Sequence, residues 1–459
     1  MRLEVQRWTC CRYYISLIFF LSAVPLRFAP VCKAAEGQIA KFVDPEAFTN
    51  GWFGTSVALG DGLVFVGSSP LPESNGPAGS VSLFSEDASG QWQFFQELIP
   101  SDIASGDRFG TSVALSGDYF IASASIAIPG TASRAGSVYA FEKAESGEWI
   151  EADKLTPPTP VSFSGAIAID GNTLVVGAGD MAPNGEVGGR AYVYRRNELG
   201  SWDQVATLKP SDAEAKDGFG FCSVGISGDK IIVGSYLDDN VAHEAGSAYI
   251  FEEDANGSWN QTAKLIASDA STFNWFGSEV GISGDTAVVG SLYGGNYGDR
   301  SGKVYVFQSD EAGGWVEREI LVPSDGIVGT GLGKEIAISG DLIVCGALTD
   351  DQGQFTGSAF AFRRDDNGDW QQIAKLIAND AAAEDHFGYS SLSIHGGRVL
   401  VGSFVDDHSG YEDAGSAYLF RVPEAPAKSL VLVGLASLLL YNRSVSRTGV
   451  VRFAVMRRS

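Results

Sequence analysis

Residues 276–325 read FGSEVGISGDTAVVGSLYGGNYGDRSGKVYVFQSDEAGGWVEREILVPSD, and this stretch decides the fold. Short apolar runs rich in valine and isoleucine alternate with glycine-rich breaks, a pattern typical of β-strands joined by turns. Four strand-sized segments are visible: Phe276 to Ile282, Thr286 to Val289, Lys303 to Phe307, and a fourth that follows the turn before Trp315. The turn at Ser283-Gly284-Asp285 supplies the residues that a tight hairpin needs. The stretch therefore predicts a small antiparallel sheet.

The same unit recurs along the chain at an interval of about 56 residues. Its opening dipeptide stands at Phe53-Gly54, Phe109-Gly110, Phe219-Gly220, Phe276-Gly277 and Phe387-Gly388. Two further copies begin at Phe163-Ser164 and Leu332-Gly333, so the period is unbroken over seven units. Self-similarity at roughly this period, with strands in each copy, predicts a β-propeller or a similar array.

Six tryptophans hold the same place in successive units: Trp92, Trp149, Trp202, Trp259, Trp315 and Trp370. A platform for a cofactor or a sugar is one interpretation. Packing between units is the other, and one tryptophan in each unit favours it, because a large aromatic side chain buries much area at a fixed spacing. We therefore expect these tryptophans to be structural.

The number of strands predicts how the array closes. All seven copies contain the first three strands, but only six contain the tryptophan-bearing fourth strand, since the last copy ends at Phe420-Arg421. Residues Gly37 to Phe42 resemble Gln261 to Ile266, so an N-terminal strand should complete the seventh blade. Such a seam leaves no open sheet edge between the first and last blades. We predict an all-β fold, a seven-bladed β-propeller of four-stranded antiparallel blades over residues 36–421, closed by that strand.

The two ends of the chain differ from the ring. Residues 1–35 contain arginines, an apolar run and small residues before a plausible cleavage site, which predicts a secretory signal peptide, with an uncleaved anchor as the alternative. Residues 422–459 contain Pro423-Glu424-Ala425-Pro426, a short hydrophobic segment and scattered arginines. This tail resembles in part the PEP-CTERM sorting signal, which implies contact with a membrane or a sorting machinery. An inert tail is the alternative.

Composition and charge narrow the class of partner. The formal net charge of −24 argues against nucleic acid or an anionic membrane as the partner of the ring. The 57 glycines suit a protein built from many short strands and turns. We expect a monomeric ring that is secreted or held at the cell surface. Cys222 and Cys345 follow no metal-binding spacing, and we expect both to be free and buried.

The repeats resemble a known family. The segments Ala-Lys-Leu-Ile-Ala-Ser-Asp (263–269), Phe-Gly, Ile-Ser-Gly-Asp and Val-Val-Gly-Ser are similar to the bacterial FG-GAP repeat, which is related to the propeller of integrin α subunits. The resemblance covers nearly all of residues 38–421. It implies an extracellular protein that binds proteins, glycans or surfaces rather than an enzyme.

Calcium loops of the integrin type are not expected beside the Phe-Gly dipeptides. There the integrin pattern has a loop with several aspartates, whereas this chain has only a tight turn. Four such turns are Ser116-Gly117-Asp118, Ser227-Gly228-Asp229, Ser283-Gly284-Asp285 and Ser339-Gly340-Asp341. One aspartate on a short turn cannot supply the roughly six to eight oxygens that calcium takes.

Another set of carboxylates is a better candidate for a metal site. The loops between second and third strands are long, and three of them carry an Asp pair: Asp238-Asp239, Asp350-Asp351 and Asp406-Asp407. An up-and-down blade opens these loops on the same rim as the inter-blade linkers, which carry Asp102, Asp212, Asp269, Asp325 and Asp380. We name the three Asp pairs as candidate metal ligands, with calcium as the ion they would suit and no cofactor required. The alternative is that aspartate only caps and solvates the loops.

No catalytic motif is visible in the sequence, so we expect a protein that is not an enzyme. His386, His395 and His408 fall in one unit, either as a metal or acid–base site or as features of one atypical blade. Three functions stay open. The first is an adhesion module that binds an extracellular protein or polysaccharide through the rim of long loops. The second is a structural repeat protein of the envelope or matrix. The third is a carbohydrate-active enzyme, which should concentrate buried acids in one or two blades.

Overall fold

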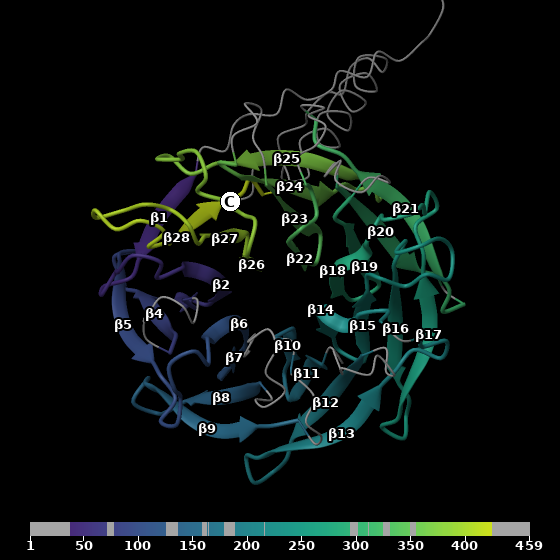
Figure 1. The fold of residues 1–459 in the computed structure, drawn as a ribbon, viewed down its shortest axis with the longest axis horizontal. Helices are drawn as coiled ribbons and strands as arrows, with labels where there is room; N and C mark the ends of the chain where they lie inside the picture. The colour runs from purple at the N-terminus through teal and green to yellow at the C-terminus, as the bar shows by residue number, and fades with distance from the viewer. Residues whose placement is uncertain are drawn as a thin grey trace, which may run out of the picture. The chain divides into compact units, whose positions relative to one another are not determined.

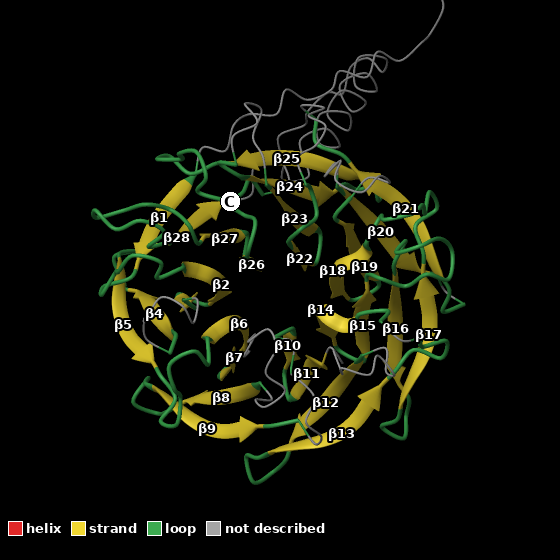
Figure 2. Cartoon of the chain, viewed as in Figure 1, coloured by secondary structure: helices red, strands yellow, loops and turns green. Residues whose placement is uncertain are grey.

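The computed structural model describes residues 37–70, 78–124, 136–157, 163, 165–178, 189–214, 216–293, 302–310, 312–324, 331–348 and 355–424. Within these ranges the strands form seven four-stranded antiparallel sheets, arranged as the blades of a ring (Figures 1 and 2). The predicted signal peptide, and the predicted tail beyond Glu424, lie outside the described residues. Among the described residues, no helix is long and apolar enough to cross a membrane.

Each blade places its strands in the same order from the centre of the ring outward (Figure 1). The inner strands are β2 (Phe53–Gly60), β6 (Phe109–Ser116), β10 (Ile167–Asp170), β14 (Phe219–Ser227), β18 (Phe276–Ser283), β22 (Ile336–Ser339) and β26 (Leu392–His395). The second strands are β3 (Leu63–Ser68), β7 (Tyr119–Ala124), β11 (Thr173–Ala178), β15 (Lys230–Ser235), β19 (Thr286–Ser291), β23 (Leu342–Ala347) and β27 (Arg398–Ser403).

The outer half of each blade completes the sheet. The third strands are β4 (Ser80–Glu86), β8 (Ser137–Lys143), β12 (Arg190–Arg196), β16 (Ser247–Glu253), β20 (Lys303–Ser309), β24 (Ser358–Arg364) and β28 (Ser416–Arg421). The outer strands are β5 (Trp92–Leu98), β9 (Trp149–Leu155), β13 (Trp202–Leu208), β17 (Trp259–Leu265), β21 (Trp315–Leu321), β25 (Trp370–Leu376) and β1 (Gln38–Val43). We number the blades 1 to 7 from the one that begins with β2.

Strand β1 is the outer strand of blade 7, as predicted, because that sheet has the order β1-β28-β27-β26. Its register copies that of the other blades: Lys41 lies opposite Tyr418 in blade 7, and Lys264 lies opposite Tyr249 in blade 4. The side chain of Gln38 accepts a hydrogen bond from the Asn379 amide at 2.9 Å, which ties β1 to the linker that enters blade 7. The N-terminal strand thus closes the ring.

The six repeated tryptophans pack between blades, which confirms the structural interpretation. Trp149 of blade 2 lies against Phe65 of blade 1, with ring centroids 5.1 Å apart, and Phe65 itself stacks on Phe120. The same arrangement crosses the seam, where Phe42 of β1 meets Trp92 of blade 1 at 5.4 Å. Buried aromatic and aliphatic side chains of neighbouring blades therefore form the core.

The glycine near the end of the second strand, present in every blade except blade 2, allows the next blade to approach. A Cβ atom on Gly67 would lie 2.2 Å from the carbonyl oxygen of Gly110, which belongs to the Phe-Gly of the next blade. Across the seam, a Cβ atom on Gly402 would lie 2.1 Å from the carbonyl oxygen of Gly54. The repeated Phe-Gly and Gly-Ser motifs therefore meet at the contact between blades.

The Ser-Gly-Asp turns also join neighbouring blades. The hydroxyl of Ser227 accepts a hydrogen bond from the Gly284 amide at 3.0 Å, and that of Ser283 accepts one from the Gly340 amide at 3.0 Å. These turns lie at the ends of the inner strands away from the long loops, because the inner strand runs from the loops to the turn. The turn face of the ring is thus held by short polar links.

Candidate functional site

Where the structure describes them, the long loops and the inter-blade linkers lie on the same face of the ring, as the sequence predicts. The residue before three of the Phe-Gly dipeptides bonds to the loop of the preceding blade. The Trp275 amide donates to the Glu244 carbonyl at 3.2 Å, the Trp52 amide to the Asp413 carbonyl at 3.2 Å, and the His386 amide to the Phe355 carbonyl at 3.0 Å. We call this surface the long-loop rim. Its completely described parts are the loops 236–246 and 404–415 and the linkers 44–52, 99–108, 266–275 and 377–386.

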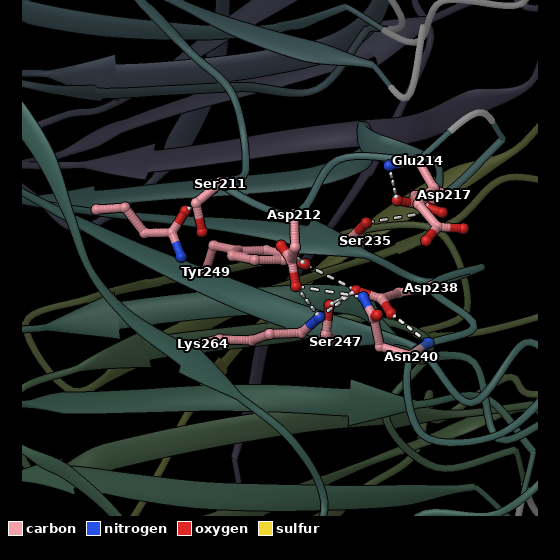
Figure 3. A network of polar contacts seen from close by, with 11 residues as sticks. Ser211, Asp212, Glu214, Asp217, Ser235, Asp238, Asn240, Ser247, Tyr249 and Lys264 are labelled. Atoms are coloured by element: carbon pink, nitrogen blue, oxygen red, sulfur yellow. Dashed lines mark hydrogen bonds and ion pairs between the residues drawn. The ribbon is translucent and has the colours of Figure 1, made fainter. Parts of the chain in front are cut away.

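A lysine from the outer strand binds one candidate metal ligand of blade 4, Asp238, together with an aspartate of the linker (Figure 3). The ammonium of Lys264 lies 2.6 Å from Asp212 Oδ2 in the linker and 2.8 Å from Asp238 Oδ2 in the loop. The Tyr249 hydroxyl lies 2.7 Å from Asp238 Oδ2, and the Ser247 hydroxyl donates to the same oxygen at 2.7 Å. The arrangement clamps loop and linker to the blade.

Related clamps recur around the ring. They pair Lys41 with Asp380 and Asp406 at 2.7 and 2.9 Å, Lys154 with Asp102 at 2.5 Å, and Lys303 with Asp269 at 2.5 Å. In the first two clamps, as in blade 4, the lysine lies over a tyrosine of the third strand at about 5 Å from the ring centroid, within cation–π range. The clamp is thus a repeated device, and Lys303 reaches its aspartate from the third strand instead of the outer one.

The clamp of blade 4 keeps its members charged. Burial alone would lower the pKa of Lys264, but its bonds to Asp212 and Asp238 raise that pKa above the usual value. Burial alone would raise the pKa of Asp238, but its bonds to Lys264 and Ser247 lower it below the usual value. A positive charge therefore already sits between the two carboxylates.

In the two Asp pairs that the structure describes, the second member caps its own loop. Asp239 Oδ1 accepts a hydrogen bond from the Glu244 amide at 2.5 Å, and Asp407 Oδ1 accepts one from the Asp413 amide at 2.8 Å. Asp350 and Asp351 lie outside the described residues. Where the structure describes the chain, no three His, Cys, Asp or Glu side chains gather as a metal site. Calcium at the Asp pairs stays a prediction, and a lysine ammonium competes for the first aspartate of two pairs.

The three histidines of blade 7 do not converge. His395 Nε2 lies 2.6 Å from Asp61 on the turn face, and His408 Nε2 lies 2.9 Å from the Gly415 carbonyl on the rim. His386 packs among aromatic rings. His386, His395 and His408 therefore do not form a single metal or acid–base site.

Aromatic side chains gather at two places on the long-loop rim. The first cluster joins blades 4 and 5 and contains Phe221, Tyr236, Trp275 and Tyr293, with centroid distances of 4.8 to 6.2 Å between neighbours. The second joins blades 6, 7 and 1 and contains Phe355, His386, Tyr389, Phe404 and Trp52. Every member keeps part of its surface exposed.

Three residues of these clusters have an unusual backbone. Each of them stands directly before the Phe that opens a blade. They are Trp52, Trp275 and His386, with φ of 54°, 55° and 54°. Left-handed φ values strain bulky residues and favour glycine. Blades 4 and 6 place Gly218 and Gly331 at this position, with φ of 71° and 64°. The turn thus requires a left-handed residue, and three blades use a strained aromatic side chain there.

A second feature lies at the centre of the ring. A cavity of about 300 Å³ lies among the inner strands. Each blade contributes the residue opposite the small residue of its second strand: Ser56, Ser112, Ala166, Ser223, Glu279, Glu335 and Ser391. Cys222 also lines this cavity and is exposed there, contrary to the expectation that it is buried, because a bulge between Phe219 and Val224 turns it inward. Cys345 is free and buried.

The two glutamates come from adjacent blades and interact. Burial raises the pKa of Glu279, and the negative charge of Glu335 raises it further. Burial also raises the pKa of Glu335, while Lys334 opposes the shift, with its ammonium 3.4 Å from Glu335 Oε1. Ser223 donates a hydrogen bond to Glu279 Oε1 at 2.8 Å. Two neighbouring carboxylates of blades 5 and 6 thus line the cavity.

Sequence reasoning missed both the lysine clamps and the glutamate pair, although each has a sequence signal. Lys41, Lys154, Lys264 and Lys375 hold one place in the outer strands. Glu279 and Glu335 stand where most other inner strands have serine. Comparison of the repeats with one another, position by position, would have revealed both.

The ring, its repeated blade contacts and its loop-bearing rim define a repeat β-propeller. The family profile of the FG-GAP repeat matches residues 92–141, 202–251, 259–307, 315–362 and 370–420, together more than half of the chain. The chain belongs to the FG-GAP repeat family. A search of curated proteins gave no match.

Proposed function

We propose that this chain is an extracellular or cell-surface binding module that recognises a protein or a glycan through the long-loop rim and catalyses no reaction. The observation that carries the proposal is the pair of aromatic clusters on that rim. Trp52, Trp275 and His386 adopt strained φ values there, although glycine serves the same turn in two other blades. Strain of this kind is concentrated at functional sites.

The chemistry of the clusters supports recognition. Part-exposed aromatic rings supply contact area with little conformational freedom to lose, and they are enriched among the residues that dominate binding energy. Two exposed apolar side chains, Val241 and Tyr411, lie on long loops of the same surface. The clamps and inter-blade bonds hold the loops 236–246 and 404–415 in place, so a partner would meet an ordered surface there.

Location outside the cytoplasm is part of the proposal. It draws on the signal-like residues 1–35 and on the tail 422–459 with its partial likeness to a bacterial PEP-CTERM signal. The net charge of −24 supports a protein partner with basic groups, or a neutral glycan, over nucleic acid. We propose a monomeric ring that needs no cofactor.

The two other functions differ in what supports them. A purely structural repeat protein has no need for aromatic clusters that differ between blades. A carbohydrate-active enzyme draws support from the carboxylates of Glu279 and Glu335 in adjacent blades, since glycoside hydrolysis uses paired acids. Release of reducing sugar from polysaccharides by the full-length chain would favour that alternative.

The proposal is tested by screening the full-length chain against arrays of glycans and extracellular proteins, with and without calcium. We expect saturable binding to at least one ligand class. Trp275→Gly should weaken it about tenfold or more, because the indole is a contact residue and glycine fits the turn. Phe95→Ala is the matched control, since Phe95 is an exposed aromatic residue on the outer strand β5. Equal losses in both variants, or no ligand, would contradict the proposal.

A further inference from the structure

The central cavity breaks the sevenfold repetition at one position. Four blades place serine there and one places alanine, whereas blades 5 and 6 place Glu279 and Glu335. Two of the serines join neighbouring blades, because Ser56 donates to the Gly110 carbonyl at 2.7 Å and Ser391 to the Gly54 carbonyl at 2.9 Å, each in the next blade. The fold therefore favours a small residue at this position and has no need of a carboxylate.

Two glutamates at this position cost stability. A carboxylate removed from bulk water is destabilised, and a second carboxylate nearby adds repulsion. Both effects are present here, since burial and the charge of Glu335 raise the pKa of Glu279. Groups that break a local pattern at the expense of stability are expected at functional sites.

The remaining lining offers mainly hydrogen-bond acceptors. The hydroxyls of Thr55 and Thr111 donate to the Trp52 and Arg108 carbonyls at 2.6 Å each, so their oxygens can act only as acceptors toward other groups, and Thr111 Oγ1 already lies 3.0 Å from Ser69 Oγ. The carboxylates add further acceptors. A suitable ligand is therefore rich in donors.

The charged side chains beside the cavity then limit which ligands rich in hydrogen-bond donors can bind. Lys334 pairs with Glu335, and its ammonium also lies over the Tyr389 ring at 5.4 Å from the centroid. This fixed positive charge disfavours a metal ion or an organic cation, while the two glutamates disfavour an anion. An uncharged molecule with several hydroxyl groups satisfies both conditions.

We propose that the central cavity binds an uncharged polyhydroxylated molecule about the size of a monosaccharide, with Glu279 and Glu335 accepting hydrogen bonds from its hydroxyls. The volume of about 300 Å³ lies at the lower end of ligand pockets. This site is separate from the aromatic clusters of the long-loop rim. It does not rest on the function proposed for them.

The test uses the full-length chain and free D-glucose, D-galactose, D-mannose and N-acetyl-D-glucosamine, with binding followed by saturation-transfer NMR and titration calorimetry. The central variant is Glu279→Ser, which restores the residue of most other blades and leaves the Lys334–Glu335 pair intact. Glu279→Gln keeps the shape of the side chain and removes its charge. Glu151→Gln is the matched control, because Gln261 and Gln372 hold that outer-strand place in other blades.

We expect one of these sugars to bind the wild-type chain saturably. Glu279→Ser and Glu279→Gln should weaken binding about tenfold or more, and Glu279→Ser should unfold at a Tm no lower than that of the wild type. Glu151→Gln should bind the free sugar normally. Any of four results would overturn the proposal: no sugar binds, Glu279 variants bind as the wild type does, Glu279→Ser lowers the Tm, or calcium chloride or ethanolamine binds in place of the sugars.

Discussion

At the scale of the residue, single lysines determine whether the carboxylates of the long-loop rim are available to ligands. Lys264 holds a buried aspartate of the loop and a half-exposed aspartate of the linker with one ammonium group. Lysines of the blades therefore neutralise part of the negative charge of the long-loop rim that the sequence predicts. The net charge of the chain does not predict this neutralisation, because the neutralisation depends on which lysine contacts which aspartate in the folded blade.

We predict that Lys264→Met lowers the free energy of unfolding by about 3 kcal/mol, since it leaves Asp238 buried without its counter-ion. Lys230→Met is the control, because its partner Asp229 is exposed and such pairs contribute under about 1 kcal/mol. Chemical denaturation measures both. Asp238→Asn added to Lys264→Met should recover part of the loss, and equal losses in the two lysine variants would contradict the clamp.

Asp217 should make stability depend on pH. Burial first, and then the charge of Asp238, raise the pKa of Asp217 from 3.8 to about 6. The folded state therefore holds this proton more tightly than the unfolded state, and its contribution to stability is lost as the pH rises from about 4 to about 6. Asn274 occupies the same place in blade 5 and is likewise buried.

We accordingly predict that Asp217→Asn stabilises the chain by about 1 kcal/mol at pH 7.5 and that the gain vanishes near pH 4. Thermal unfolding between pH 4 and pH 8 measures the effect. A gain of equal size at all pH values would show that a change other than the carboxyl charge is responsible.

At the scale of the element, the contact between blades explains the repeated dipeptides. The second strand needs a glycine because the Phe-Gly backbone of the next blade passes directly over it. Blade 2 is the informative exception. Its second strand has Ser123 in the glycine position, and the following blade begins with Phe163-Ser164 instead of Phe-Gly.

We predict that Gly234→Ala costs about 3 kcal/mol, since the new Cβ atom would lie 2.0 Å from the Gly277 carbonyl oxygen. Ser123→Ala, at the same position of blade 2, should cost only about 1 kcal/mol, for the hydrogen bond between its hydroxyl and the Ser112 amide. Denaturant midpoints of the two variants decide the matter. Similar losses would contradict the close approach.

At the scale of the whole molecule, the ring depends on one short strand at the beginning of the described chain. Strand β1 supplies the register, the Lys41 clamp and the Gln38 cap that outer strands supply elsewhere. Contacts between the first and last blades make the ring continuous, and Phe42 lies in the core that they share. The contacts that close the ring between blades 7 and 1 are therefore of the same kinds as those within and between the other blades.

We predict that a chain beginning at residue 47 unfolds at a lower temperature and less cooperatively than a chain beginning at residue 36, because the truncation exposes the edge of β28. Circular dichroism and light scattering follow unfolding and aggregation. Unchanged thermal stability in the shorter chain would contradict closure by β1.

The fold was predictable from the sequence because the repeated strands and turns, and the additional N-terminal strand, can be counted there. For the candidate site, the sequence predicted which loops lie on the same rim but not which side chains contact one another there. The partner of Asp238 is a lysine on the outer strand of the same blade, and the neighbour of Glu279 is a glutamate in the next blade. The exposure of Cys222 depends on a bulge in β14. Contacts across strands and blades of this kind follow from register, which sequence pattern alone leaves open.

Amide hydrogen exchange of the full-length chain, with and without a partner retained from the arrays, tests most directly whether binding uses the long-loop rim. We predict that the partner slows exchange in residues 236–246, 266–275 and 404–415, and leaves the Ser-Gly-Asp turns unchanged. Protection confined to those turns or to the outer strands would contradict binding through the rim.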